Sequence, residues 1–430
     1  MKNIPGIDTL PPAEIKKLQE EKLRNLLVYI EKKSPFYKEL FLKNRIDISG
    51  IKTFEDLKNI PTTSKDILQE RNSDFLCVDR TEIAEYCSTS GSMGLPLTIA
   101  LTEKDLERLA YNVYLSFLCA DSKPSDIFQL MLTLDRQFMA GIAYYAGARR
   151  LGAGIVRTGP GNLGMQIDCI ARLGSNVLIA VPSYIISLIN YAEEKKISLN
   201  ETSVRAVICI GENIREEDFS LNELGKRIVK NWNVQLYSTF ASTEMQTAFT
   251  ECSFGNGGHH HPELLLFEIL DENNNQLPAG EYGELTITTL GVEGMPLLRY
   301  KTGDICTYHD KPCACGRNSV RISPIKARKQ QLIKYNGTTL YPQSIFNMLN
   351  SIEDIEDYVV QIFNTEIGTD DMMINIALRN SGAETENKIK QSLQSALKVT
   401  PKIKYMPLAE INRMQQLDIK RKANRLIDTR

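Results

Sequence analysis

The 430-residue sequence lacks a strong charge of one sign, because 51 Lys and Arg balance 53 Asp and Glu to a formal charge of −2. A nucleic-acid-binding protein usually has a strongly basic domain, so we expect no nucleic-acid partner. It also lacks a long apolar run. The most apolar stretch, residues 177–189, contains Pro182, Ser183, Tyr184 and Ser187 and is shorter than the roughly 20 residues of a membrane-spanning helix. We therefore expect no membrane partner.

Cysteine is scarce too, with nine residues in the whole sequence, far below the density of a secreted disulfide scaffold. Lys2 is followed by no apolar run, so the N-terminal residues do not predict a secretory leader. These two absences indicate a cytoplasmic protein with reduced cysteines. At roughly 100–200 residues per domain, the length allows two to four domains.

Helical and strand patterns alternate over much of the sequence. Apolar residues at helical spacing predict a helix over 12–33, and Ser34-Pro35 predicts the start of a second helix near 37–43. After about residue 125, short β-rich runs alternate with helical stretches, which indicates a largely parallel α/β sheet. The strands are expected at 127–132, 155–157, 177–181, 206–210 and 234–237, and the helices at 139–151, 164–173, 183–195 and 216–231.

The pattern changes after about residue 262. Strand-like runs at 264–270, 283–290 and 297–300 are separated by Asn, Gly and Pro turns, which predicts an antiparallel β section. The last hundred residues predict a small α+β domain, with its boundary near 328–331. Its elements are expected in the order helix 342–349, strand 358–363, strand 372–378, helix 384–397 and strand 402–405.

A loop rich in Ser, Thr and Gly follows Cys87. Its glycines Gly91 and Gly94 permit positive φ, so that backbone N–H groups can converge on an anion. Ser88, Thr89, Ser90 and Ser92 add hydroxyl donors. The loop lacks the Gly-Lys-Ser/Thr ending of a Walker A motif. Composition alone leaves two interpretations open, phosphate binding and a plain surface turn.

A second glycine-rich segment, Gly159-Pro-Gly161-Asn-Leu-Gly164, matches the G-x-G-x-x-G pattern between a predicted strand and helix. A dinucleotide site also needs an acidic residue about 20 positions later, at the end of the next strand. That strand ends in Ala180-Val181-Pro182 without a carboxylate. The segment is therefore not expected to bind a dinucleotide.

Cysteine and histidine cluster in two nearby segments. Cys313-Ala-Cys315 is a C-x-C pair, and Cys252 precedes the three consecutive histidines 259–261 in a Gly-rich loop. Three thiolates and one imidazole would form a closed, structural zinc site. The alternative is chance, since reduced proteins contain C-x-C pairs without metal and the histidines could form a solvated turn. The remaining cysteines are expected to be small buried residues.

Two acidic residues stand where ligand-binding groups are expected. Glu244 follows a predicted strand, where a carboxylate can bind a cation, and Asp304 follows a strand and a Gly turn, where it can accept hydrogen bonds from sugar hydroxyls. An ordinary loop carboxylate and a turn-closing Asp are the alternatives. The basic run 420–425 is expected to be a solvated helix end.

Taken in order, these motifs resemble the phenylacetate–CoA ligase family of the adenylate-forming (acyl-CoA synthetase) superfamily. The similarity covers almost the whole chain and includes a Ser/Thr/Gly loop, Pro-Ser-Tyr, Gly-Glu and Thr-Glu elements, an Arg-Tyr…Asp stretch and Cys-x-Cys-Gly-Arg. These are Thr89–Gly94, Pro182–Tyr184, Gly211-Glu212, Thr243-Glu244, Arg299–Asp304 and Cys313–Arg317, with Gly283–Leu285, Tyr341–Gln343 and Lys422–Arg425 further matches.

The resemblance implies the adenylate-forming fold: a large N-terminal α/β domain (1–328) with an antiparallel β section, and a mobile C-terminal α+β domain (329–430). It implies that a carboxylate attacks the α-phosphate of ATP and that CoA then displaces AMP, with Mg²⁺ as cofactor. The resemblance also implies which residues bind the nucleotide: Ser88, Thr89, Ser90, Gly91, Ser92, Gly94, Gly211, Glu212, Phe240, Ala241, Ser242, Thr243, Asp304 and Arg328.

Further assignments follow from the same resemblance. Glu244 would bind Mg²⁺, Lys422 would bridge carboxylate and nucleotide during adenylation, and a homodimer is expected. The acyl pocket is expected around Phe138, Tyr144, Gly211 and Ala241, and a structural zinc ion at Cys252, His259, Cys313 and Cys315.

The sequence departs from the family pattern at three places. Leu95 stands where the phosphate loop usually has Lys, Ala241 where Gly is usual, and Gln330 where the hinge usually has Asp. The leading hypothesis is an ATP-dependent acyl-CoA ligase for a small carboxylate, with aryl acids such as phenylacetate among the expected substrates. An adenylyltransferase with another acceptor and a non-catalytic nucleotide- or CoA-binding relative are the alternatives.

Overall fold

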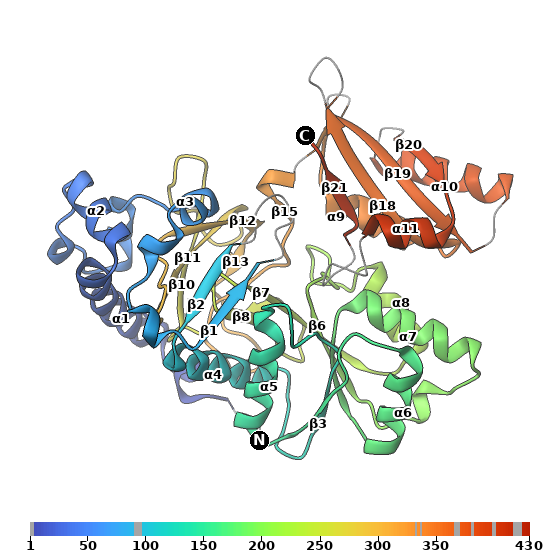
Figure 1. The fold of residues 1–430 in the computed structure, drawn as a ribbon, viewed down its shortest axis with the longest axis horizontal. Coiled ribbons are helices and arrows are strands. Elements are labelled where there is room, and N and C mark those ends of the chain that lie inside the picture. Colours follow the sequence, from blue (N-terminus) through green and yellow to red (C-terminus); the bar gives the residue numbers. More distant parts are fainter. Residues whose placement is uncertain are drawn as a thin grey trace. The chain divides into compact units, whose positions relative to one another are not determined.

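The structure, a computed structural model, describes residues 4–89, 97–331, 333–335, 338–364, 370–379, 382–397, 401–415 and 424–430. The chain divides into two compact units. The first comprises residues 1–89, 96–221 and 225–325, and the second comprises 326–430 with the short segments 90–95 and 222–224. Figure 1 shows the helices and strands of both units. The predicted domain boundary at 328/329 stays a prediction.

The first unit begins with the two predicted helices, α1 (Pro12–Lys33) and α2 (Pro35–Asn44). The apolar face of α1 is buried, which is the reason this amphipathic segment forms a helix. Ser34 caps α2 by accepting a hydrogen bond from the Tyr37 N–H at 3.4 Å, and Pro35 occupies the first turn. The buried Tyr37 hydroxyl accepts a hydrogen bond from the Leu298 N–H at 2.8 Å, which fixes α2 against the antiparallel section.

The centre of the first unit is a mixed sheet whose parallel part confirms the predicted α/β pattern. In the described residues its full order is β13-β14-β9-β8-β7-β6-β5-β3-β4. The parallel strands are β3 (Ile127–Leu130), β4 (Gly154–Arg157), β5 (Val177–Ala180), β6 (Ala206–Ile210) and β7 (Gln235–Ser242). The helices between them are α5 (Met139–Leu151), α6 (Leu163–Leu173), α7 (Pro182–Glu194) and α8 (Glu223–Asn231).

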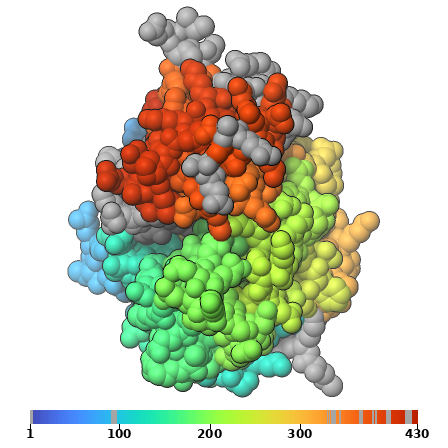
Figure 2. All heavy atoms as spheres, turned by 90° about the vertical axis from the view of Figure 1, so that its right-hand side faces the viewer, coloured from blue at the N-terminus to red at the C-terminus, as the bar shows by residue number. Residues whose placement is uncertain are grey.

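The strand order places a change of direction at β3. The chain passes from β3 outward to β4, then returns to β5 on the other side of β3 and continues to β6 and β7. Because such crossovers are right-handed, α5 lies on one face of the sheet and α6 and α7 on the other. Figure 2 views the molecule from the side of α6 and α7, which form much of the green surface.

Two predicted elements differ from the structure. The helix expected over 216–231 begins only at Glu223, because Ser220 donates from its N–H and its hydroxyl to Asp218 and Phe219 has φ +68°. The strand expected over 297–300 is instead β12 (Tyr300–Cys306), because Arg299 has φ +48° and interrupts the extended backbone just before it.

The antiparallel part of the first unit includes β8 (Thr247–Glu251) and β9 (Gly258–His259), which extend the central sheet from β7. β13 (Tyr308–His309) and β14 (Arg321–Ile322) complete its edge. A second sheet joins β10 (Leu265–Leu270), β11 (Gly283–Thr289) and β12 in antiparallel pairs. A hairpin of β1 (Glu85–Ser88) and β2 (Thr98–Leu101) precedes the long helix α4 (Glu103–Cys119), and α3 (Lys65–Glu70) lies upstream.

The second unit has the predicted α+β composition. Its sheet in the described residues has the order β20-β19-β18-β21, in which the antiparallel pair β18 (Ile355–Asn364) and β19 (Asp370–Leu378) is flanked by parallel partners. These flanking strands are β20 (Lys402–Tyr405) and β21 (Leu426–Asp428). The other elements are β15 (Ala327–Arg328), β16 (Ile333–Tyr335), β17 (Thr338–Leu340), α9 (Pro342–Asn350), α10 (Ala383–Leu397) and α11 (Leu408–Gln415).

No helix in the described part of either unit is long and apolar enough to cross a membrane.

Candidate functional sites

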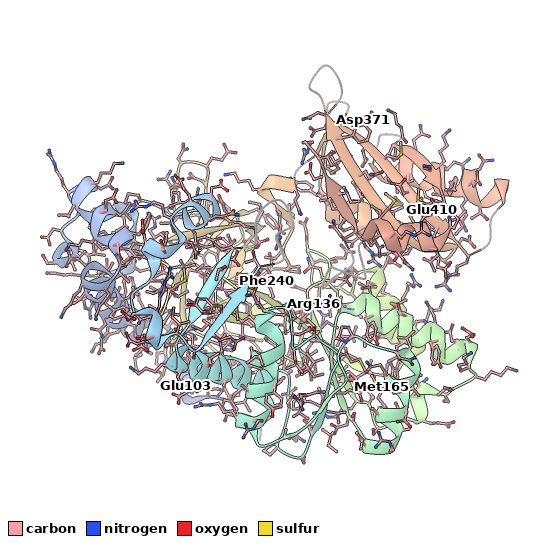
Figure 3. The ribbon with its side chains drawn as sticks, viewed as in Figure 1. Glu103, Arg136, Met165, Phe240, Asp371 and Glu410 are labelled. Carbon is pink, nitrogen blue, oxygen red and sulfur yellow. The ribbon has the colours of Figure 1, made fainter. Side chains whose placement is uncertain are left out.

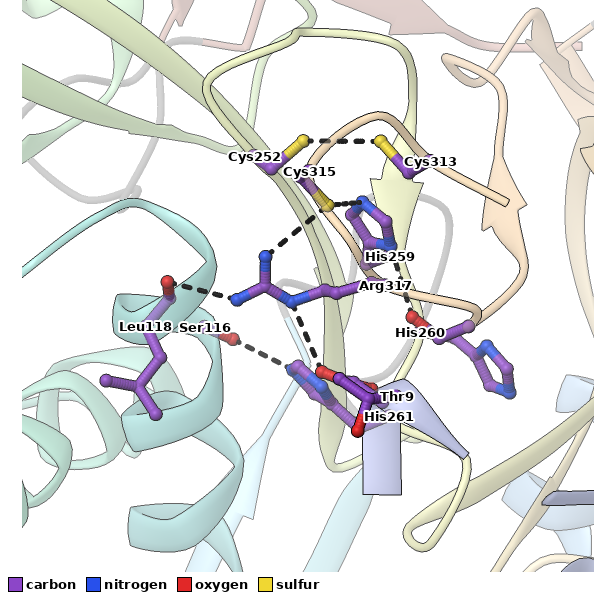
Figure 4. A network of polar contacts seen from close by, with 12 residues as sticks. Thr9, Ser116, Leu118, Cys252, His259, His260, His261, Cys313, Cys315 and Arg317 are labelled. Atoms are coloured by element: carbon purple, nitrogen blue, oxygen red, sulfur yellow. Dashed lines mark hydrogen bonds and ion pairs between the residues drawn. The ribbon is translucent and has the colours of Figure 1, made fainter. Parts of the chain in front are cut away.

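Four predicted metal ligands meet in one buried cluster of the first unit. The possible ligand atoms of Cys252, His259, Cys313 and Cys315 all lie within 4.8 Å of one another, and all four residues are buried (Figure 4). The Cys252 and Cys313 sulfurs are 3.7 Å apart, and His259 Nε2 is 3.6 Å from the Cys315 sulfur. His259 comes from β9, whereas the C-x-C pair comes from the turn between β13 and β14.

These distances fit a tetrahedral zinc ion. With Zn–S near 2.3 Å and Zn–N near 2.0–2.1 Å, tetrahedral angles separate two sulfurs by about 3.8 Å and a sulfur from a nitrogen by about 3.6 Å. Hydrogen bonds from Cys252 and Cys313, and to a smaller extent from His259, lower the pKa of the Cys315 thiol. The same contacts raise the pKa of Cys252, so the cluster favours the thiolate, the form that binds metal, at Cys315.

The geometry distinguishes His259 from the two histidines that follow it. His259 presents Nε2 to the thiols because its Nδ1 is 3.1 Å from the Ser319 hydroxyl, a contact that fixes the ring orientation. His260 instead contacts the Val320 carbonyl. His261 contacts the Ser116 hydroxyl (Figure 4). Among the described residues, His309 does not join the cluster either.

Arg317 connects the cluster to the start of the chain. Its guanidinium donates to the Cys315 sulfur at 3.6 Å, to the Leu118 carbonyl at 3.2 Å and to the Asp8 carboxylate at 3.2 Å. Arg317 and Asp8 are only 1% and 3% exposed, so this ion pair is buried. The guanidinium therefore holds the positions of Cys315 and of the segment around Asp8 together (Figure 4).

A second group of predicted residues meets around the Tyr300 hydroxyl. Burial, followed by the nearby charges of Glu244 and Asp304, raises the pKa of Tyr300. Glu244 follows β7 and Asp304 lies on β12, so the fold brings carboxylates from two sheets to one phenol. A neutral phenol adds no charge of its own to the two carboxylates beside it.

The next predicted residues follow β6, at the same carboxyl edge of the parallel strands. Gly211 has φ +79°, and this left-handed turn directs the chain away from the sheet. Glu212 accepts two hydrogen bonds at 2.9 Å, one from the N–H and one from the hydroxyl of Ser183, at the start of α7. This carboxylate fixes the turn after β6 to the turn after β5.

The predicted pocket residues differ in exposure. Tyr144 on α5 is buried, and Phe138, just before α5, is half-buried. Phe240, Ala241 and Ser242 form the end of β7, where Phe240 is half-buried and Ala241 is exposed.

The predicted phosphate loop is described only at its base. Ser88 is the last residue of β1. The Thr89 N–H donates to the Leu97 carbonyl at 2.9 Å, and the Leu97 N–H donates to the Thr89 hydroxyl at 3.1 Å. These bonds close a loop with a hydrogen-bonded base. Ser90, Gly91, Ser92 and Gly94 lie outside the described residues, as do Leu95 and Lys422. Arg328 ends β15 in the second unit.

Comparison with known proteins identifies the family. The AMP-binding enzyme family model matches residues 8–294, about two thirds of the chain, and the model of the AMP-binding enzyme C-terminal domain matches residues 337–430. The chain belongs to the AMP-binding enzyme family. Within it, a phenylacetate-coenzyme A ligase from Thermus thermophilus is 29% identical over 356 residues, covering 82% of this chain and 78% of that protein. The one from Escherichia coli is 22% identical over 384 residues, covering 87% and 85%.

Solved structures confirm the adenylate-forming fold. A 2-hydroxyisobutyryl-CoA ligase in the postadenylation state, in complex with R3-HIB-AMP, has a TM-score of 0.86 and 22% identity, over 99% of this chain and 91% of that one. ATP-bound MatB from Rhodopseudomonas palustris has a TM-score of 0.59 and 16% identity, over 77% and 65%. The predicted fold class and the resemblance to phenylacetate–CoA ligases are thus confirmed. The roles of individual residues in this AMP-binding enzyme stay predictions.

Sequence reasoning missed three residues of these sites. Tyr300 was counted only as a motif residue, although an aromatic hydroxyl four positions before Asp304 on one strand is a usable signal. Arg317 lies in the Cys-x-Cys-Gly-Arg motif, and that proximity could have suggested its contact with Cys315. Nothing in the sequence indicates that Asp8 is its partner, since 309 positions separate them.

Proposed function

We propose that this AMP-binding enzyme is an ATP-dependent ligase that converts a small carboxylate to an acyl-AMP and transfers the acyl group to CoA. The observation that carries the proposal is the match of both family models, to residues 8–294 and 337–430. The relatives named phenylacetate-coenzyme A ligases, at 29% and 22% identity, support a small acid and aryl acids in particular.

The first step would take place at the carboxyl edge of the parallel strands. Attack of the substrate carboxylate on the α-phosphate builds negative charge on the phosphate oxygens, which positioned donors and cations stabilise. The loop from Ser88 to Gly94 would supply N–H and hydroxyl donors to the phosphates. Glu244 would hold Mg²⁺, and the neutral Tyr300 hydroxyl near it would help to orient this carboxylate.

The nucleotide would bind around the same edge. The Asp304 carboxylate would accept hydrogen bonds from the ribose hydroxyls, and Arg328 would stand near the ribose or phosphate. Gly211, Glu212 and residues 240–243 would line the adenine and acyl sites. The fixed turn of Glu212 against Ser183 supports this assignment, because a rigid wall positions a ligand better than a mobile loop.

Lys422 would supply the cation that bridges carboxylate and α-phosphate during adenylation. The C-terminal domain, 329–430, would then rotate about residues 328–330 to present another face for thioester formation. This part of the proposal rests on the sequence motif Lys422-Ala-Asn-Arg425 within the matched C-terminal region.

A zinc ion at Cys252, His259, Cys313 and Cys315 belongs to the same proposal. Four protein ligands leave no open position, so the ion would act as a structural cross-link between β9 and the turn after β13. The donor set and its spacing support zinc. We also propose a cytoplasmic location, where ATP and CoA are available and thiols stay reduced, and a homodimer, by resemblance to the family.

The test is carboxylate-dependent ATP–pyrophosphate exchange over aryl and short aliphatic acids, followed by AMP release with and without CoA. We expect exchange with particular acids, and AMP release that CoA accelerates. Exchange combined with AMP release that CoA does not accelerate would indicate another acceptor, as in an adenylyltransferase. Bound nucleotide without exchange for any acid would instead indicate a non-catalytic relative.

A further inference from the structure

Helix α4 carries a row of buried polar side chains toward the two sheets of the first unit. Asp105, Arg108, Asn112 and Ser116 recur every three or four positions, which places them on one face of the helix. All four are buried, although buried helix faces are usually apolar. Figure 3 shows the side chains of α4, whose first residue, Glu103, is labelled. Buried polar groups need partners, and the partners of this row indicate its role.

Two members of the row hold backbone N–H groups of neighbouring segments. Asp105 accepts hydrogen bonds from two N–H groups of the loop after β11, at 2.7 and 2.8 Å. Asn112 accepts one from the Ala248 N–H on β8, at 3.0 Å. The row therefore binds both sheets, and Arg108 lies between these two residues.

The Arg108 guanidinium joins the turn after β7 to the end of the β10–β11 pair. It donates to the Gln246 carbonyl at 2.8 Å and to the hydroxyl of Thr247, the first residue of β8, at 3.2 Å. It also donates to the Leu290 carbonyl at 2.8 Å and to the Leu264 carbonyl. Leu264 directly precedes β10 and Leu290 directly follows β11. One side chain thus fixes the central sheet to the second sheet.

These two sheets supply the two carboxylates of the proposed nucleotide site. Glu244 lies in the turn between β7 and β8, and Asp304 lies on β12, which pairs with β11. Gln246, at the end of that turn, has φ +51°, a left-handed conformation that is unfavourable for a non-glycine residue. The hydrogen bond from Arg108 to the Gln246 carbonyl holds this strained end of the turn, two residues after Glu244.

The contacts of Arg108 explain why an arginine stands at this position. Among the described residues it donates only to a hydroxyl and to backbone carbonyls, which are neutral. Burial lowers the pKa of Arg108 to about 10, so its guanidinium stays charged at neutral pH. A buried charge that forms no ion pair is unfavourable. Arginine offers several donors in one rigid fork, however, and can therefore bind acceptors on two sheets at once.

We propose that Arg108 is a positioning residue for the adenylation step, which holds the turn after β7 so that the Glu244 carboxylate is placed to hold Mg²⁺. This inference rests on the proposed ligase function and on the role assigned there to Glu244. Arg108 would act through the backbone of Gln246 and through Thr247, not by touching the nucleotide. Since a displacement of about 1 Å can cost about 100-fold in rate, loss of these contacts should change the dependence on Mg²⁺.

The experiment is a double-mutant cycle between Arg108 and Glu244. The wild type, Arg108→Lys, Glu244→Gln and the double variant are compared in two measurements. One is the Mg²⁺ dependence of ATP–pyrophosphate exchange with an accepted acid. The other is the rise in melting temperature that Mg²⁺ causes in the presence of ATP without any acid. Arg108→Lys keeps the charge but loses the fork that spans both sheets.

The matched control is Arg321→Lys. Arg321, on β14, is also buried and also donates to two backbone carbonyls, at 2.7 and 3.0 Å. Both substitutions should therefore lower the melting temperature of the ligand-free protein, while Arg321→Lys should keep the Mg²⁺ dependence of the wild type.

We expect Arg108→Lys to raise the Mg²⁺ concentration for half-maximal exchange about 10-fold or more. It should also remove most of the Mg²⁺-dependent rise in melting temperature. In the Glu244→Gln background, the same substitution should change the exchange rate less than about twofold, because the carboxylate that it positions is already gone.

Two results would overturn the inference while leaving the ligase intact. One is an Arg108→Lys variant with a lower melting temperature but the Mg²⁺ dependence of the wild type, since Arg108 would then be structural only. The other is a double variant in which the two losses add, since Arg108 would then act on a group other than Glu244.

A milder variant covers the case in which Arg108→Lys does not fold. Thr247→Val removes one acceptor of the guanidinium with little change of shape, and should raise the Mg²⁺ requirement about threefold. An unchanged requirement in this variant would count against the inference. Absence of exchange with every acid in the wild type would instead reject the proposed ligase, and this inference with it.

Discussion

At the scale of single residues, neighbours in the sequence have different surroundings. His259, His260 and His261 are consecutive and all buried, yet their ring nitrogens have different partners. His259 contacts the Cys315 thiol and the Ser319 hydroxyl, His260 contacts a backbone carbonyl and an amide side chain, and His261 contacts the Ser116 hydroxyl. β9 ends at His259, so the three rings are not arranged by one regular strand, and only His259 places a ring nitrogen among the cysteine sulfurs. The direction of each ring thus decides which histidine can complete the proposed metal site.

This difference predicts the metal content of two variants. His259→Ala should lose most of the bound zinc, about one ion per chain in the wild type, because a closed four-ligand site needs its imidazole. His260→Ala removes an equally buried ring outside the cluster and is the matched control. Zinc would be measured by atomic absorption after dialysis against a chelator. Equal zinc contents in both variants would contradict the assignment of His259.

A second prediction at this scale concerns the carboxylate beside Tyr300. Glu244→Gln keeps the size of the side chain but removes the charge that would hold Mg²⁺, so ATP–pyrophosphate exchange should fall about 100-fold or more. The exposed Glu272→Gln should leave the rate unchanged. The rate is to be measured over a range of Mg²⁺ concentrations. A Glu244→Gln variant with wild-type exchange would remove Glu244 from the metal site.

At the scale of elements, one buried ion pair joins strands that are distant in the sequence. Arg299, just before β12, donates to both oxygens of Glu268 on β10 at 2.9 and 2.8 Å, and also to the Ile60 carbonyl. Both side chains are almost fully buried. This pair fixes the entry into β12, and through it the positions of Tyr300 and Asp304.

Breaking the pair should therefore be costly. Arg299→Met leaves the Glu268 carboxylate buried without its partner and should lower the free energy of unfolding by about 3–5 kcal/mol. Arg299→Met with Glu268→Met should recover much of that loss, since both charges are then gone. The exposed pair of Lys16 and Glu55 is a control expected to contribute at most about 1 kcal/mol. Chemical denaturation measures these differences; additive losses in the double variant would argue against coupling.

Most elements could be predicted from the sequence where local signals act alone. Helix α5 has its predicted bounds, Met139–Leu151, because its apolar periodicity ends at Gly152, which takes the left-handed C-terminal position. The predicted strand 297–300 differs from β12 because Arg299, which pairs with the distant Glu268, has φ +48° and interrupts the strand. No local sequence pattern contains this tertiary contact.

The candidate site was predictable to a similar degree. The residue types for zinc were evident from Cys252, the histidines and the C-x-C pair, because ligand chemistry is local. Which histidine joins the thiols, and that Glu244 and Asp304 face Tyr300, depended on strand register and on pairing between distant segments. Such long-range pairing is not encoded in spacing.

At the scale of the whole molecule, the proposed chemistry is divided over the chain. Glu244, Asp304 and the metal cluster lie in the first unit, while the sequence motif with Lys422 lies in the matched C-terminal domain. A reaction with two steps can use such a division, because one domain can hold the nucleotide while the other changes the groups presented to it.

This division predicts that Lys422→Ala separates the two half-reactions. Adenylation should fall about 100-fold or more, because the variant lacks the cation that neutralises the developing charge. Thioester formation from supplied acyl-AMP should change by no more than a few-fold. Lys420→Ala, two positions earlier in the same basic run, is the control. Rapid-quench assays of each half-reaction provide the comparison, and an equal loss in both would reject this role for Lys422.

The ion pair between Asp8 and Arg317 has a consequence for biosynthesis. At about 5–20 residues per second of translation, these partners, 309 positions apart, emerge from the ribosome about 15 to 60 s apart. During this interval the Asp8 carboxylate has no Arg317 partner and stays hydrated, although α1, α2 and the parallel strands have already been synthesised. The first unit can finish folding only after the turn that carries Cys313 and Cys315 has been synthesised. Binding of the proposed zinc ion would therefore be among the last events in the folding of this unit.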